Sequence, residues 1–318
     1  MDENPKATYR QSSRELAEAE LIRFVHNPGL AELASLYGVN KLPEDRTEKI
    51  AVLQAIAAKN WDFRKGKERQ EVDWDNHYLD QEGSLQRNTV FAATDKLGLV
   101  QNTEPKNKHP NTLAILGGDN HAPFDRLKYG LSIVEDFDQL VFLGSSRKLS
   151  GTARTNAADY APNAKTEFEL GCGAIDKLLS AKVIDDIIVE SEGDSLGLRL
   201  YEFERNDEVK YGFALNTPYR VGSDRHRATT YDNYRFFVYR VELDKNPDHS
   251  VVAVTTGLYT AEQQIPAIQE LTLPYGTSVE TVGYSAEYVG NIIKPTQLLQ
   301  EIKAAIDAAV RLNKVLIA

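Results

Sequence analysis

The sequence predicts an α/β fold in which a mostly parallel β-sheet is covered by helices on both faces and is preceded by a helical region. Two observations predict it. Apolar residues recur at helical spacing through the first part of the chain, and beyond residue 111 short apolar runs alternate with helical stretches. Strands that alternate with helices form parallel sheets. A third observation, two alternating runs around Asn206-Asp207, predicts a β-hairpin over residues 197–218, inserted in the α/β part.

The chain is predicted to divide into a helical N-terminal region, residues 1–105, and an α/β domain, residues 111–318. Its 318 residues exceed one average domain. The segment VQNTEPKNKHPN at 100–111 contains two prolines and no apolar periodicity, so we interpret it as a linker.

Five short apolar runs predict the strands, and five amphipathic stretches predict the helices that follow them. The predicted strands are 112–116, 139–143, 186–190, 251–256 and 278–283. The predicted helices are 123–136, 166–179, 229–243, 261–271 and 295–312. Because helices separate the runs, we expect the strands to lie side by side in one sheet.

Composition excludes several classes of protein. The formal net charge of -10 argues against binding to nucleic acid, which usually needs a broad basic surface. No apolar run approaches the roughly 18 residues of a membrane span, so no membrane partner is expected. Cys172 is the single cysteine, which rules out an internal disulfide. Together with a polar N-terminus that lacks a secretory signal, it predicts a cytoplasmic location. The oligomeric state is left open.

The first predicted strand ends in a loop suited to ligand binding. In open parallel sheets, ligands bind beyond the carboxyl ends of the strands. Gly117 and Gly118 allow a sharp turn and a close approach of the backbone. Asp119, Asn120 and His121 then lead into a helix, whose N-terminus can hold an anion. The alternative is a tight strand–helix turn that needs glycine for its shape.

Two further strand ends carry small and polar residues. The candidate binding residues are Gly144, Ser145, Ser146 and Arg147 after the second strand, and Thr255, Thr256 and Tyr259 after the strand at 251–256. The alternatives are a solvated loop arginine at the first of these and an N-cap threonine at the second.

A cationic stretch, GSDRHRATTYDN, precedes a predicted helix that begins at Thr229 or Thr230. In an acidic chain, an anionic ligand needs a local cluster of cations. We therefore expect Arg225 and Arg227 to bind an anionic ligand, most simply a phosphate. The alternative is a salt-bridge network on the surface.

These features favour an enzyme, a hydrolase or a transferase, that acts on a small phosphorylated or nucleotide-like substrate. Asp119, His121 and His226 are the candidate acids and bases. The alternatives are a non-catalytic nucleotide or metabolite sensor and an S-adenosylmethionine-binding protein. Asp119, His121 and Asp224 could ligate a metal, but their spacing matches no ligand pattern, so no metal is predicted. The sequence assigns no cofactor.

Several motifs, in order, resemble one family. They are LAILGG, Arg126, LVFLGSSR, ATTYDN, VVAVTTGLYTAEQ and LLQEIKAAIDAA. With these motifs residues 111–314 resemble the YdcF/SanA/ElyC-like proteins, which implies a Rossmann-like three-layer α/β/α fold with a polar pocket at the strand ends. Nucleotide-like or S-adenosylmethionine binding is suggested for some members, and cell-envelope roles for others. This chain departs from them in lacking a membrane anchor, in its 197–218 hairpin, and in Ala153, where the family tends to have an acid.

Overall fold

The computed structural model describes residues 5–67, 72, 74, 78–80, 84–191, 194–218, 228–241, 243 and 248–318. The chain forms two compact units. Unit 1 comprises Met1–Thr103, Gly257–Gln269 and Gly283–Ala318, and unit 2 comprises Glu104–Thr256 and Glu270–Val282. The helical first hundred residues thus cluster with two later segments. A domain boundary between residues 105 and 111 stays a prediction.

Unit 1 is built from helices. They are α1 (Pro5–Val25), α2 (Pro28–Ser35), α3 (Arg46–Asn60), α4 (Leu85–Lys96), α9 (Thr260–Ala267) and α11 (Pro295–Ile317), with short 3₁₀ turns η2 (Tyr78–Asp80), η4 (Gly257–Tyr259) and η6 (Ala286–Val289). Side-chain caps fix where three of the helices begin, because each accepts a backbone N–H of the first turn. The capping residues are Asn27 for α2, Asp45 for α3 and Ser84 for α4.

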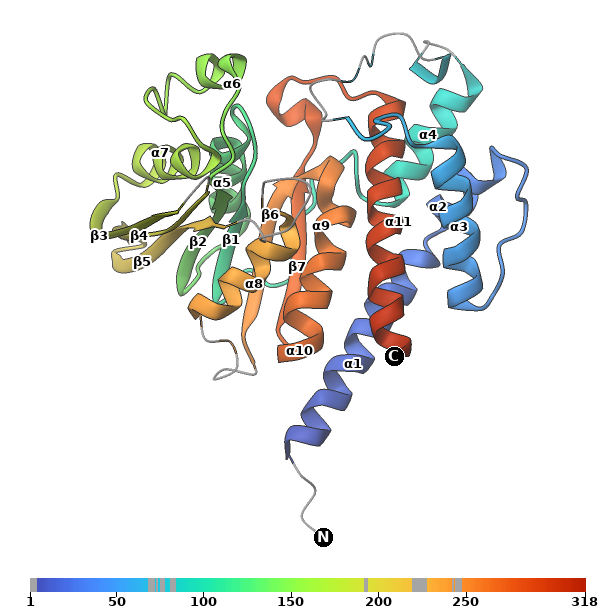
Figure 1. Cartoon of the computed structure of the whole chain (residues 1–318), viewed down its shortest axis with the longest axis horizontal. Coiled ribbons are helices and arrows are strands. Elements are labelled where there is room, and N and C mark those ends of the chain that lie inside the picture. Colours follow the sequence, from blue (N-terminus) through green and yellow to red (C-terminus); the bar gives the residue numbers. More distant parts are fainter. Residues whose placement is uncertain are drawn as a thin grey trace. The chain divides into compact units, whose positions relative to one another are not determined.

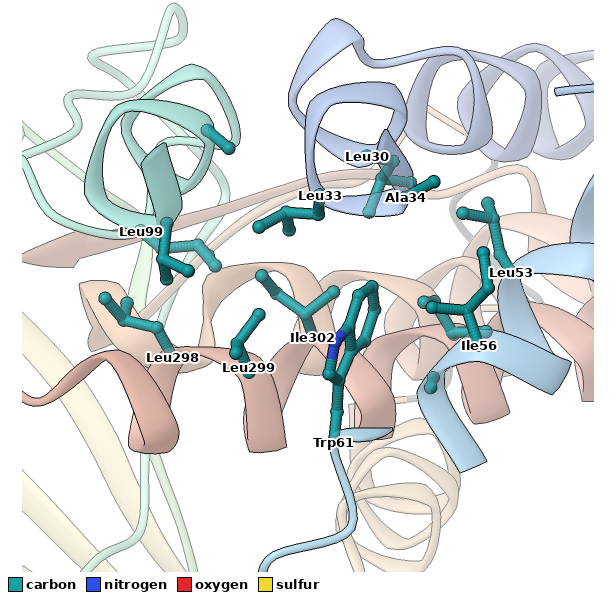
Figure 2. Packing of buried hydrophobic residues seen from close by; sticks show 14 of the residues in the cluster. Leu30, Leu33, Ala34, Leu53, Ile56, Trp61, Leu99, Leu298, Leu299 and Ile302 are labelled. Carbon is teal, nitrogen blue, oxygen red and sulfur yellow. The ribbon is translucent and has the colours of Figure 1, made fainter. Parts of the chain in front are cut away.

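The core of unit 1 forms where α2, α3, α4 and α11 pack together. Its fully buried side chains include Leu30, Leu33, Leu53, Trp61, Leu298, Leu299 and Ile302. Figure 2 shows the Trp61 indole lying between Ile302 and Ile56. The ring of Tyr37 meets this indole edge-on, with 5.9 Å between centroids. Trp61 is therefore the largest single block of apolar surface in this core.

Unit 2 contains a seven-stranded sheet, whose last strand ends in unit 1. The strands are β1 (Thr112–Leu116), β2 (Gln139–Ser145), β3 (Lys182–Ser191), β4 (Asp194–Arg205), β5 (Glu208–Thr217), β6 (Ser250–Thr256) and β7 (Ser278–Tyr284), in the order β3-β4-β5-β2-β1-β6-β7. β2 and β6 run parallel to β1, and β5 runs parallel to β2. The predicted mixed α/β fold with a mostly parallel sheet is confirmed.

Helices cover both faces of the centre of this sheet. They are α5 (Ala122–Ile133), α7 (Glu167–Leu179) and α8 (Thr230–Val241). The short α6 (Gly151–Asn156) follows β2, and the π-turn η5 (Ile268–Thr272) and α10 (Leu273–Tyr275) precede β7. All five residues of β1 are buried, as expected for a strand covered on both faces. In Figure 1, α5 and α7 lie above the sheet and α8 below it. The arrangement is the three-layer, Rossmann-like one that the sequence predicts.

The predicted hairpin forms, and it belongs to the sheet. Asn206 and Asp207 both have positive φ, 53° and 62°, as a two-residue type I′ turn requires. The hairpin is longer than predicted, since its strands β4 and β5 extend from Asp194 to Thr217. Because β5 pairs with β2, the hairpin extends the sheet from its parallel centre.

The predicted strand at 186–190 differs from expectation. It lies within β3, which is the edge strand and runs antiparallel to β4. Its pairing is irregular between Val183 and Asp185. Ile187 and Ile188 are 47% and 46% exposed, although they point to opposite faces. The adjacent Asp185 and Asp186 fit this edge position, since edge strands often carry charged side chains, and Asp186 Oδ2 pairs with Arg199 Nη2 over 2.6 Å.

A buried polar network joins the amino ends of the central strands. Gln139 Nε2 donates to Thr112 Oγ1 over 2.7 Å, and His249 Nε2 lies 2.8 Å from the same oxygen. His249 is 6% exposed. Burial lowers the pKa of His249, and the Asp138 carboxylate opposes this more weakly. Folding therefore favours the neutral imidazole.

The pH dependence of stability should reveal this histidine. Its folded pKa lies below the unfolded value of about 6.5, so its contribution is complete above pH ~6.5 and is lost as pH falls below that value. We expect the thermal midpoint of the parent to fall more steeply below pH ~6.5 than that of His249→Asn, which lacks the titrating group. Parallel pH profiles for the two proteins would contradict this assignment.

No helix among the described residues is both long enough and apolar enough to serve as a membrane span.

Candidate functional site

The end of β1 lies directly against a carboxylate from the start of α7. Gly117 N–H donates to the carbonyl of Leu143 in β2 over 2.8 Å. A Cβ added to Gly117 would stand 2.7 Å from Glu167 Oε1 and 2.7 Å from that carbonyl. Both distances are too short for a real Cβ contact, so this position needs glycine. The glycine allows Glu167, at the start of α7, to lie against the end of β1.

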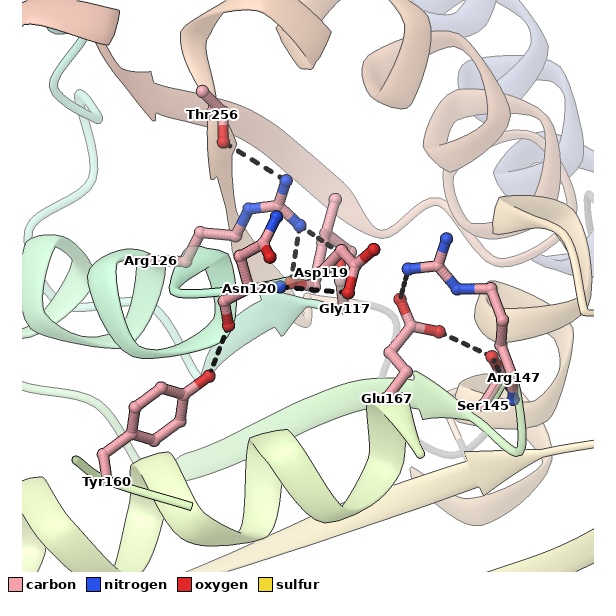
Figure 3. A network of polar contacts seen from close by, with 10 residues as sticks. Gly117, Asp119, Asn120, Arg126, Ser145, Arg147, Tyr160, Glu167 and Thr256 are labelled. Carbon is pink, nitrogen blue, oxygen red and sulfur yellow. Dashed lines mark hydrogen bonds and ion pairs between the residues drawn. The ribbon is translucent and has the colours of Figure 1, made fainter. Parts of the chain in front are cut away.

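Three side chains meet at the end of β2. The Ser145 hydroxyl lies 2.5 Å from Glu167 Oε2, to which it donates a hydrogen bond. Arg147 Nη2 lies 3.5 Å from Glu167 Oε1 as an ion pair. The Glu167 side chain is 12% exposed and that of Arg147 is 27% exposed. Figure 3 shows the carboxylate pointing toward both partners. We call Ser145, Arg147 and Glu167 the polar cluster.

The local chain path explains how Glu167 reaches this place. Glu167 N–H donates to the Arg147 carbonyl over 3.0 Å, and Lys148 forms a bridge with Thr166. These bonds fold the chain back so that α7 begins beside the end of β2. Thr166 caps α7 in a capping box with Glu169, which fixes Glu167 as its first residue.

Arg126 links the ends of β1 and β6 from below the loop. Its guanidinium donates to the carbonyls of Leu116 and Gly117, and to Thr256 Oγ1 over 3.2 Å. The residue is 4% exposed. In the sheet, β1 lies between β2 and β6, and the chain passes from β1 to β2 on one side and later returns to β6 on the other. Open α/β sheets bind ligands at the carboxyl end of the strands where the strand order reverses in this way. Arg126 thus holds the two strand ends at that position.

The rest of the β1–α5 loop is fixed by contacts of its own. Asn120 has φ +53°, a left-handed conformation that asparagine tolerates, and its carbonyl accepts the Tyr160 hydroxyl over 2.7 Å. The Asp119 carboxylate accepts the Asn120 N–H over 3.0 Å. His121 Nε2 lies 3.1 Å from the exposed carboxylate of Asp159. Neither candidate acid–base residue of this loop contacts the polar cluster, and their catalytic roles stay predictions.

The other predicted site residues have different surroundings. Gly144 is required for packing, since a Cβ there would lie 2.5 Å from the Phe142 ring. Thr255 is buried at the end of β6, while Tyr259 is the last residue of η4 in unit 1. Gly118 lies over Arg126, and Ser146 is half-buried between Ser145 and Arg147. Arg225, His226, Arg227 and Asp224 lie outside the described residues.

Sequence reasoning missed Glu167. The residue lies in a predicted helix, and nothing in its immediate neighbours distinguishes it from a solvated first-turn acid. The sequence feature that could have pointed to Glu167 is the Thr166/Glu169 capping box. It marks Glu167 as the first residue of a helix that comes after the second predicted strand. The described residues contain no group of three or more His, Cys, Asp or Glu side chains arranged to hold a metal ion.

Comparison with known proteins identifies a matching family model and mycobacterial relatives. A family model described as the Rv3785 N-terminal domain matches residues 8–98. The chain is 24% identical over 241 residues to three uncharacterized proteins, Mb3814 of Mycobacterium bovis and MT3893 and Rv3785 of Mycobacterium tuberculosis. The match covers 70% of this chain but spans 65% of the relatives' length. No solved structure matches.

Proposed function

We propose that the protein is an enzyme that binds and acts on a small anionic, phosphorylated or nucleotide-like substrate at the carboxyl ends of β1, β2 and β6. The observation that carries this proposal is the polar cluster at the end of β2. The Ser145 hydroxyl and the Arg147 guanidinium both contact the Glu167 carboxylate, so a donor and a cation lie beside a proton acceptor. The cluster lies beside the glycine that ends β1.

The charged side chains around this edge of the sheet include two cations and one carboxylate, and the cations support binding of an anionic ligand. Arg147 is the partly exposed cation of the cluster, and Glu167 offsets part of its charge at 3.5 Å. Arg126 adds a second, buried cation below the same loop. The N-terminus of α5 adds backbone N–H groups and a partial positive charge. Arg225 and Arg227, predicted from the sequence as anion-binding residues, lie outside the described residues and stay candidate cations of the proposal.

The resemblance of residues 111–314 to the YdcF/SanA/ElyC-like proteins supports the same proposal. It implies a polar pocket at the strand ends, and nucleotide-like or S-adenosylmethionine ligands. Glu167 provides an acid after the second strand, although Ala153 stands where the family pattern suggests one. A cytoplasmic location belongs to this proposal and agrees with the buried, unpaired thiol of Cys172.

Replacing Arg147 by alanine tests the anion site. We expect calorimetry with phosphate, nucleotides and S-adenosylmethionine to show a parent that binds at least one of them. The variant should bind it roughly tenfold or more weakly, because a charged hydrogen bond contributes about 1.5–3 kcal/mol.

Arg154→Ala is the matched control, since Arg154 is exposed on α6 and its loss changes the net charge equally. Equal effects of both variants, or a parent that binds none of these ligands, would overturn the proposal. Phosphorus NMR of the bound nucleotide then separates an enzyme, which releases product, from a sensor, which leaves the ligand intact.

A further inference from the structure

Glu167 brings a negative charge to an edge where an anion is proposed to bind. Its Oε1 lies 2.7 Å from the position that a Cβ on Gly117 would occupy, so the carboxylate lies at the base of the β1–α5 loop. A phosphate bound against this carboxylate would meet a like charge at short range. The ligand group that faces Glu167 must therefore be a hydrogen-bond donor.

The carboxylate retains capacity to accept such a donor. An ionised carboxylate has about four acceptor positions. Within the described part of the chain, the Ser145 hydroxyl is the side chain that donates to it, at Oε2. Arg147 lies 3.5 Å from Oε1, which is longer than an ordinary N–H···O hydrogen bond of about 2.7–3.2 Å. Oε1 therefore has, besides this long ion pair, the capacity to accept a further hydrogen bond.

The place that favours a negative group and the carboxylate that needs a hydrogen-bond donor lie next to each other in the fold. The loop that follows β1 and the N-terminus of α5 favour a negative group. Glu167, the first residue of α7, lies beside the end of the adjacent strand β2, and its carboxylate oxygens accept the hydrogen bonds that sugar hydroxyls donate. The substrate then needs both an anionic group and hydroxyl donors a few bonds away.

We infer that Glu167 binds the hydroxyls of the substrate and that the substrate is a phosphate ester of a polyhydroxyl compound, such as a sugar phosphate or a nucleotide. This inference rests on the proposed function, because it presupposes an anion site at the same edge. It excludes inorganic phosphate and simple alkyl phosphates as the preferred ligands. No covalent step is required of Glu167.

Calorimetry with three probes tests this inference. They are inorganic phosphate, adenosine 5′-monophosphate and its 2′,3′-dideoxy analogue. We expect the parent to bind the monophosphate about tenfold or more tightly than the dideoxy analogue, and Glu167→Gln to reduce that ratio to about threefold or less. Glu135→Gln is the control, since Glu135 is an exposed carboxylate just beyond the far end of α5, and it should keep the parent ratio.

The outcomes separate this inference from the proposed function. A parent that binds all three probes with equal affinity keeps the anion site and overturns the role of Glu167. A hydroxyl preference that persists in Glu167→Gln also overturns it. A parent that binds none of the probes overturns the proposed function and the inference with it. If Glu167→Gln does not fold, the parent ratio of the two nucleotides and the variant Glu167→Asp still decide the question.

Discussion

Replacing Trp61 by alanine should lower the free energy of unfolding of unit 1 by about 3–5 kcal/mol, the range for truncating a large buried aromatic side chain. Trp61 is fully buried among Leu53, Ile56 and Ile302. These side chains belong to α3 and α11, and the helical backbone limits how far each side chain can move. They can therefore fill the vacated space only in part, and a cavity remains.

Urea denaturation followed by far-ultraviolet circular dichroism measures this effect. Leu85→Ala is the control, because Leu85 is an apolar residue of α4 that is 77% exposed. Its loss should change the free energy of unfolding by no more than about 0.5 kcal/mol. A Trp61→Ala protein as stable as the Leu85→Ala protein would refute the packing described for unit 1.

Replacing Arg126 by methionine should destabilise unit 2 by roughly 2–4 kcal/mol and also weaken ligand binding. The substitution keeps most of the apolar stem but removes donors to the carbonyls of Leu116 and Gly117 and to Thr256. Buried carbonyls that lose a charged donor each contribute to the loss. The end of β1 would no longer be tied to the end of β6, so the loop that begins at Gly117 would lose its support.

Two further variants make the test specific. Arg126→Lys keeps the charge, but a single ammonium group cannot replace a planar fork that reaches three acceptors, so an intermediate loss is expected. Arg154→Met makes the same arginine-to-methionine change at an exposed position, so it should leave stability and ligand binding nearly unchanged. Thermal melts and calorimetry give both readouts. If Arg126→Met melts and binds like Arg154→Met, Arg126 does not hold the strand ends.

Local sequence signals predicted much of the fold. The hairpin turn followed from Asn206-Asp207, two residues that accept positive φ, and the turn forms there. The sequence predicted that a helix starts at Thr229 or Thr230, and α8 starts there, with Thr229 Oγ1 accepting the Asp232 N–H over 3.3 Å. These features depend on neighbouring residues, so the sequence carries them directly.

The features that were missed depend on residues far apart in the chain. Gly117 and Glu167 meet because β1 pairs with β2 and because the chain folds back between Arg147 and Glu167. No local pattern at either residue announces this contact. The same applies to β3, whose five-residue apolar run resembles that of a central strand. Its edge position follows from the antiparallel pairing with β4, which periodicity alone does not reveal.

The edge strand β3 has a consequence for how copies of the protein behave at high concentration. Within the described residues it pairs with β4 alone, and it exposes Val183, Ile184, Ile187, Ile188 and Val189. Such an edge is a template on which another chain could polymerise. Asp185 and Asp186 interrupt the aliphatic run, and the irregular pairing after Val183 breaks its regularity. Arg199 compensates the charge of Asp186 over 2.6 Å, whereas Asp185 has no ion-pair partner among the described residues. Two copies aligned antiparallel about Asp185 would bring two like charges together, so this aspartate acts as a gatekeeper against fibrous assembly.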